Sequence, residues 1–240
     1  MRDTDATTRP SPNIWYWPSV YEIENKAQDV TGAIWSALAE EFDWAGRDVL
    51  DVGCGDGFHL PRFAATARSV IGVEPHQPLV RRARERVAGL DRITVASGGA
   101  QRLPLPDASV DLVHARTAYF FGRGAEPGMA EADRVLRPGG ALVIVDLDVR
   151  CQPYGGWMRA DLPDYDPADV ESFFAEQGFR CRRVRTEWCF ADARSLASVL
   201  RIEFSEQVAE RAIAETSGLS IPVGYRIHVR DKPTGLLLPG

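Results

Sequence analysis

The stretch Asp51-Val52-Gly53-Cys54-Gly55-Asp56-Gly57, which follows Asp48 and the apolar pair Val49-Leu50, decides the fold of this chain. A short β-type run ends in alternating glycines, and a helix-compatible segment follows from Phe58. This pattern predicts a strand–turn–helix junction, which places backbone N–H groups and a helix N-terminus beside a ligand. The glycines permit the turn and let a ligand approach the backbone where a Cβ atom would clash.

The spacing of the glycines narrows the class of ligand. A dinucleotide-binding turn has its third glycine or alanine one residue later, where this chain has Phe58. The turn therefore favours an adenosine-bearing ligand without a pyrophosphate bound at the helix. The glycines alone are also compatible with a generic α/β turn. Other segments of the chain are therefore needed to distinguish a ligand-binding turn from a generic one.

Composition describes an ordinary globular protein. The 240 residues are 45% hydrophobic and 26% charged, which suits one domain with a full core. A net charge of −6 gives no general attraction to nucleic acid or to anionic membranes, so we expect neither as a partner. The oligomeric state is left open between monomer and homodimer.

Targeting and metal-binding signals are absent from the sequence pattern. Residues 1–11 are polar, and no apolar run approaches the length needed to cross a bilayer, so we expect a cytoplasmic protein. The four cysteines have neither C-x-x-C spacing nor histidine partners. We therefore expect reduced thiols and no metal site.

Short apolar segments alternate with helical patterns along the middle of the chain. Such alternation predicts a parallel sheet with both faces covered by helices. The expected strands are 69–74, 92–96, 110–114 and 141–145, and the expected helices are 31–42, 77–90 and 126–136.

The last third of the chain changes character. We expect a helix over 166–178 with Asp166 as its N-cap, a strand over 179–190, one long helix over 192–216 and a final strand over 223–230. Residues 154–165 are so rich in glycine, proline and aromatic residues that they predict neither helix nor strand.

The expected domain organisation has three parts. Residues 1–12 form a disordered tail, 13–44 an N-terminal helical lid segment and 45–240 the main domain. The aromatic residues within 13–21 have two readings of about equal weight, a patch packed on the core and a lid over a ligand.

An acidic residue supports a nucleoside ligand. Glu74 ends the second expected strand, where a carboxylate can accept hydrogen bonds from the ribose 2′- and 3′-hydroxyls of a nucleotide-like ligand. A surface acid at a strand end is the plainer reading, but the preceding glycine turn favours the ribose contact.

Four ordered motifs over residues 45–150 resemble a known family. The turn 51–57, Glu74, the segment 103–113 and the segment 131–140 are together similar to class I S-adenosylmethionine-dependent methyltransferases that act on small molecules. The resemblance implies an α/β, Rossmann-like, doubly wound sheet of seven strands, with the last strand antiparallel and helices on both faces. It also implies S-adenosylmethionine as cofactor, bound by Tyr21, Asp51, Gly53, Cys54, Gly55, Gly57, Glu74, Pro75, Ala100, Gln101, His114 and Ala115.

One departure from the family concerns the adenine. Family members commonly have an aspartate near position 99 that accepts the adenine amino group, whereas this chain has Gly99. The expectation is therefore that backbone groups and Gln101 hold the ring.

Two residues are candidates for the chemistry. His114 lies at the C-terminal end of the fourth expected strand, where ligands bind in open α/β sheets, and is either a base or part of the cofactor wall. Tyr119 follows in the same loop. We also expect three aromatic segments, 15–21, 114–121 and 154–157, to wall one acceptor pocket.

These features predict methyl transfer to the oxygen or nitrogen of a small molecule, such as a metabolite or natural-product tailoring step. The acidic chain lacks the acidic-or-polar residue–Pro–Pro–aromatic motif of amino-modifying nucleic-acid methyltransferases. Two alternatives stay open: an NAD-dependent oxidoreductase, which Phe58 disfavours, and a cofactor-binding accessory protein without a usable acceptor pocket.

Overall fold

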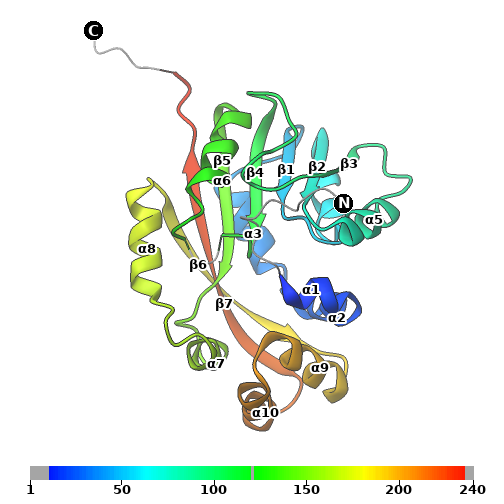
Figure 1. Ribbon diagram of the computed structural model, residues 1–240, viewed down its shortest axis with the longest axis vertical. Helices are drawn as coiled ribbons and strands as arrows, with labels where there is room; N and C mark the ends of the chain where they lie inside the picture. The colour runs from blue at the N-terminus through cyan, green and yellow to red at the C-terminus, as the bar shows by residue number, and fades with distance from the viewer. Residues whose placement is uncertain (1–10, 120–121, 236–240) are drawn as a thin grey trace.

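Seven strands form one sheet in the computed structural model, which describes residues 11–119 and 122–235 (Figure 1). The strand order is β3-β2-β1-β4-β5-β7-β6. β7 runs antiparallel to both of its neighbours, and the other pairings are parallel. The predicted fold class is confirmed. The strands are β1 Asp48–Val52, β2 Ser69–Glu74, β3 Ile93–Ser97, β4 Val110–Arg116, β5 Leu136–Leu147, β6 Arg180–Cys189 and β7 Ser220–Asp231.

Helices cover both faces of this sheet and one end of it (Figure 1). In the described residues they are α1 Pro12–Tyr16, α2 Pro18–Ala27, α3 Ala33–Glu41, α4 Leu60–Ala64, α5 Gln77–Arg86, α6 Glu126–Val135, α7 Tyr154–Asp161, α8 Pro167–Glu176, α9 Ala193–Glu203 and α10 Glu206–Glu215. None of the helices in this part of the chain is both long and apolar enough to span a membrane.

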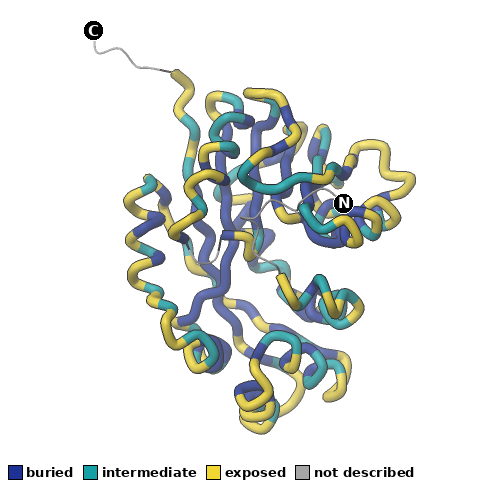
Figure 2. Tube along the Cα trace, in the orientation of Figure 1, coloured by how far each residue is buried: buried dark blue, intermediate teal, exposed yellow. Residues whose placement is uncertain are grey.

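Successive strand residues belong to two different hydrophobic cores. Val49 and its parallel neighbour Leu112 pack with α3, α4 and α5, whereas Leu50 and Val113 pack with α6 and α8. Side chains alternate across a strand, so β1, β2, β4 and β5 contribute to both cores. The central strands β1 and β4 are accordingly buried almost without interruption, whereas the edge strand β6 is largely exposed (Figure 2).

The long C-terminal strands extend the sheet beyond its parallel half. The lower ends of β6 and β7 carry α7, α9 and α10, with α1 and α2 beside them (Figure 1). Trp157, Trp188 and Phe204 fill the space between these elements. This extension forms one side of the cavity described below.

The expected long helix over 192–216 is wrong, because it is two helices. Phe204 is extended, with φ −128° and ψ 159°, and ends α9. Ser205 precedes α10, and its backbone N–H donates to both carboxylate oxygens of Asp161 at 3.1 and 3.2 Å. The break lets α9 and α10 pack as an antiparallel pair over the end of the sheet.

Residues 154–161 form α7, so the expectation of irregular structure there is also wrong. Tyr154, Trp157 and Met158 are buried at helical spacing. Gly155 is required in the first turn, since a Cβ atom there would lie 2.1 Å from the carbonyl oxygen of Val149. Gly155 is thus explained by the close approach of the Val149 backbone, and it does not indicate a loop.

The N-terminal segment divides into parts with different neighbours. α3 packs in the sheet core through Ile34 and Leu38, whereas α1 and α2 lie beside the cavity. The expected tail falls largely on residues 1–10, outside the described residues, and Pro12 already begins α1. Only α1 and α2 therefore hold the position expected of a lid.

Substitution of Gly57 tests whether packing against α5 constrains the glycine turn. The φ of Gly57 is +80°, and a Cβ atom would lie 3.2 Å from the backbone Cα of Ala83 in α5. We expect Gly57→Ala to lower the free energy of unfolding by about 2–4 kcal/mol, from left-handed strain and from overpacking. Urea unfolding followed by circular dichroism measures the change.

The matched control is Gly46→Ala. Gly46 also has a positive φ, +67°, but no atom lies within 4 Å of its Cβ position. Strain alone should cost about 1–2 kcal/mol there. Equal losses for the two variants would show that contact with α5 does not constrain the turn.

Candidate functional site

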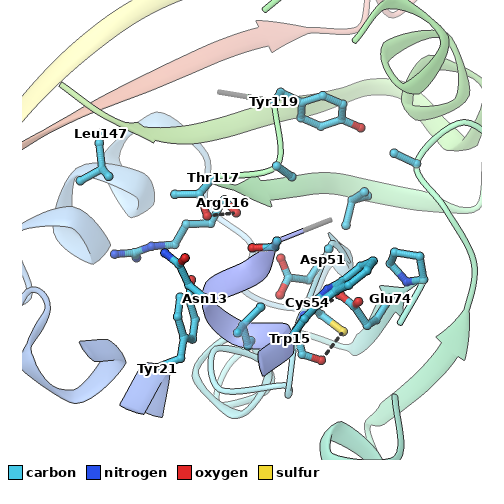
Figure 3. A pocket seen from close by; sticks show the side chains of 18 of the residues that line it. Asn13, Trp15, Tyr21, Asp51, Cys54, Glu74, Arg116, Thr117, Tyr119 and Leu147 are labelled. Atoms are coloured by element: carbon cyan, nitrogen blue, oxygen red, sulfur yellow. Dashed lines mark hydrogen bonds between the residues drawn. The ribbon is translucent and has the colours of Figure 1, made fainter. Parts of the chain in front are cut away.

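A cavity of about 590 Å³ lies at the carboxyl ends of the parallel strands, as expected for an open α/β sheet. Its wall comes from the turn after β1, the end of β2, the loop after β4, helices α1, α2 and α7, and β7. Figure 3 shows Glu74, Asp51 and Cys54 at one end, and Tyr21, Arg116 and Leu147 at the other. The cavity is therefore elongated, with two chemically different ends.

The glycine turn is held to the end of β2 by three hydrogen bonds, and a fourth fixes the Glu74 carboxylate. The N–H groups of Gly53 and Cys54 donate to the carbonyl of Val73 at 2.8 and 3.1 Å. The N–H of Gly55 donates to one Glu74 carboxylate oxygen at 3.1 Å, and the N–H of His76 donates to the other at 2.9 Å. The turn and the acid thus form one rigid unit.

Burial changes the acidity of Glu74. The side chain is 4% exposed, and burial raises the pKa of its carboxyl, an effect opposed by the two backbone N–H donors. Each oxygen has a second lone pair directed elsewhere, so the carboxylate can still accept bonds from a ligand. This is the arrangement that a ribose diol requires.

His114 does not reach the cavity. Its Nδ1 lies 2.7 Å from Asp51 Oδ1, its ring packs 5.0 Å from that of Phe63, and it is 1% exposed. His114 and Asp51 are register partners on the face covered by α4, so the imidazole lies behind the aspartate. This placement does not support His114 as a base or as a cofactor wall. It positions Asp51, whose carboxylate lines the cavity.

Two further expected cofactor residues lie away from the cavity. Ala115 is fully buried in the core beneath α6, and Gly57 faces α5. The other expected residues do line the cavity: Tyr21, Asp51, Gly53, Cys54, Gly55, Glu74, Pro75, Ala100 and Gln101. The structure therefore brings together residues from four separate segments.

Tyr119 lines the cavity but is a poor base. Its ring packs against α6, where a Cβ atom on Gly128 would lie 2.9 Å from the phenol oxygen. Burial raises the pKa of the phenol, and none of the described residues bonds its hydroxyl. The hydroxyl can serve as a hydrogen-bond donor to a ligand, because it stays protonated.

Cys54 is also protonated. It is 9% exposed, and burial together with the nearby carboxylates of Asp51 and Glu74 raises the pKa of its thiol. A thiol of this kind is a weak nucleophile. Cys54 therefore contributes a wall and not a reactive group.

The aromatic segments contribute unequally to the wall. Trp15 stacks on His76 with ring centroids 4.3 Å apart, next to Glu74 and Pro75, and Tyr21 lines the opposite end. Tyr16 and Trp17 are 69% and 58% exposed and point away. In the segment 154–157 the aromatic rings lie behind the wall, which Met158 and Leu162 supply instead. Residues 120–121 lie outside the described residues.

Sequence reasoning missed a polar face on α2. Tyr21, Glu24, Asn25 and Gln28 all line the cavity, and Glu24 and Asn25 are only 3% and 7% exposed. The signal was their spacing of i, i+3, i+4 and i+7, which defines one face of a helix. A helix that turns a polar face inward needs a polar partner there.

The cavity residues fit S-adenosylmethionine. Asp51 and Glu74 flank a glycine turn whose close approach a Cβ atom would obstruct, since at Gly55 it would lie 2.7 Å from Ile14. A buried carboxylate such as Asp51 suits the cofactor's amino group, and Glu74 suits its ribose. Ala100 and Gln101, which are expected to contact the adenine, line the same cavity.

Comparison with known proteins agrees with this geometry. Residues 50–144 match the family model described as a methyltransferase domain. The chain is 39% identical over 100 residues to a probable S-adenosylmethionine-dependent methyltransferase of Mycolicibacterium smegmatis, covering 42% of this chain and 38% of that protein. It is 36% identical over 122 residues to the 27-O-demethylrifamycin SV methyltransferase of Amycolatopsis mediterranei, covering 49% and 44%.

A solved structure supports the fold alone. The YcgJ protein of Bacillus subtilis superimposes with a TM-score of 0.61 at 17% identity, over 85% of this chain and 100% of that one. The chain spans less than half the length of the two curated relatives. Sheet order, glycine turn, Glu74 and the matched segment agree: residues 50–144 match a methyltransferase domain, and they are similar to class I S-adenosylmethionine-dependent methyltransferases, whose cofactor is S-adenosylmethionine.

Proposed function

We propose that this chain transfers the methyl group of S-adenosylmethionine to an oxygen or nitrogen of a small molecule bound in the same cavity. The observation that carries the proposal is the two-ended cavity, in which the end away from Glu74 is lined by Tyr21, Leu147, Met158 and Tyr225. Its volume of about 590 Å³ lies in the range of small-molecule sites. The name of the rifamycin relative supports a natural-product acceptor.

Each end has a separate task. The cofactor supplies an activated methyl group when bound, and Asp51, Gly55, Glu74 and Gln101 hold and orient it. α1 and α2 cover the cavity and exclude water, and the far end aligns the acceptor. Alignment of the acceptor is the main contribution that a protein makes to such a transfer.

Two rival functions make different predictions. An NAD-dependent oxidoreductase would be stabilised by NAD, and an accessory protein would bind the cofactor without consuming it. A thermal-shift comparison of S-adenosylhomocysteine, NAD and ATP separates the first rival, since a ligand of the native state raises its melting temperature. Methyl transfer from labelled S-adenosylmethionine to a library of small hydroxyl and amine compounds separates the second.

Glu74→Gln tests the ribose contact. The amide keeps an oxygen that can accept from the Gly55 N–H, so the turn should persist, but the charge is lost. We expect the affinity for S-adenosylhomocysteine to fall by about 2–3 kcal/mol, measured by calorimetric titration. Glu40→Gln, a surface acid on α3, is the control. Equal affinities for the three proteins would remove Glu74 from the cofactor site.

Trp15→Ala tests the role of α1. Because Trp15 stacks on His76 beside Glu74, its loss should weaken binding of S-adenosylhomocysteine by about 0.5–1.5 kcal/mol. Trp17→Ala removes the same side chain from the exposed face of the same segment and should change nothing. If the two variants bind equally well in calorimetry, α1 does not close over the cofactor.

A further inference from the structure

Two carboxyl groups meet at the end of the cavity away from the glycine turn. Glu24 comes from α2 and Glu203 from the end of α9, and both line the cavity. Glu24 Oε1 accepts a hydrogen bond from Gln28 Nε2 at 2.7 Å. Glu203 accepts from the hydroxyl of Tyr154 at 2.6 Å and from the side-chain amide of Asn13. α1, α2, α7 and α9 therefore all converge on this pair.

The second oxygen of Glu24 has no donor among the described residues. Glu24 is 3% exposed and lines the cavity. An unsatisfied buried carboxylate oxygen is costly, and two groups can satisfy it at the acceptor end. One is a proton shared with Glu203, and the other is a hydrogen donated by a ligand in the cavity.

The two carboxyls share a proton in the absence of a ligand. Burial, followed by the charge of the other carboxyl, raises the pKa of Glu24 well above its ordinary value, and burial also raises the pKa of Glu203. Adjacent buried carboxyls cannot both be ionised. Glu203 already accepts two bonds and is the better anion, so the proton lies on Glu24.

The surroundings define the rest of the subsite. Leu147, Met158 and Leu162 are apolar, and Tyr21 and Tyr225 add aromatic surface. The nearby cation is Arg116, which donates to Gln28 and lies 5.1 Å from the Tyr225 ring centroid. The subsite thus combines an apolar surface, which can bind the body of a ligand, with the pair of carboxyl groups of Glu24 and Glu203, which shares one proton and carries one negative charge.

We propose that the Glu24–Glu203 pair is the acceptor subsite and takes a molecule that presents a hydroxyl or amine hydrogen on an apolar body. The inference rests on the proposed function and identifies the group that takes the proton from the methyl acceptor. The acceptor heteroatom bonds to the methyl carbon as the carbon–sulfur bond breaks, and that electron pair stays on sulfur. The acceptor proton passes to the pair, which begins with one proton and ends with two.

Matched fragments test the subsite without knowledge of the natural acceptor. Benzyl alcohol and benzylamine carry a donor hydrogen on one apolar body, benzyl methyl ether replaces that hydrogen by a methyl group, and benzoate carries a negative charge and no donor. Saturation-transfer NMR measures their binding to the protein saturated with S-adenosylhomocysteine. We expect benzyl alcohol or benzylamine to bind about tenfold more tightly than the ether and benzoate, and the tighter of the two identifies the acceptor group.

Substitutions connect the preference to the pair. Glu24→Gln and Glu203→Gln should each reduce the preference for a donor hydrogen to about twofold or less. Glu210→Gln, an exposed acid of α10 that pairs with Arg201, should leave it intact. Infrared absorption of protonated carboxyl groups at neutral pH should be weaker in Glu24→Gln than in the parent protein, and the remainder comes from Asp146, whose pKa burial raises to about 7.

The outcomes separate this inference from the proposed function. Equal binding of alcohol, amine, ether and benzoate, or a preference that survives both substitutions, would overturn the subsite. S-adenosylhomocysteine affinity, measured by calorimetry on the same samples, should be unchanged in the variants and shows that they are folded. Failure of every form to bind S-adenosylhomocysteine would instead overturn the proposed function.

Discussion

The site depends on the hydrogen bond between the carboxylate of Glu74 and the backbone of the glycine turn. The carboxylate accepts from the N–H groups of Gly55 and His76, and so joins the turn after β1 to the end of β2. A buried acid is costly unless donors surround it, and here the donors are backbone groups close to the ends of β1 and β2. The ligand-facing side of the turn is therefore fixed before any ligand binds.

The second half of the cavity is built by elements that lie outside the matched segment 50–144. α1 and α2 precede it, and α7, α9 and β7 follow it, yet they meet around Glu24 and Glu203. In a fold of this kind the sheet positions the cofactor end of the cavity, and added helices form the acceptor end. The acceptor end can therefore vary while the cofactor end stays the same. The acceptor end of this chain is held by polar contacts between helices that are distant in sequence.

Alternation along the strands explains why His114 was a misleading candidate. The residue lies at the correct end of β4, but it shares a face with Leu112 and points towards Phe63 and α4. A strand-end position tells which edge of the sheet a residue occupies, and only its parity tells which face it points to. In β1, the same parity places Asp51 between His114 and the cavity.

Local sequence patterns by themselves predicted the parallel strands, the glycine turn and the position of Glu74 at a strand end, because each of these depends on neighbouring residues. The antiparallel last strand and the cofactor were predicted from the resemblance to a known family. The local patterns misjudged α7 and the break at Phe204, where a close approach to Val149 and a cap from Asp161 override local composition. The carboxyl pair was decided by the tertiary structure alone. Glu24 and Glu203 are far apart in the chain, and folding buries both in one place, which raises the pKa of each carboxyl.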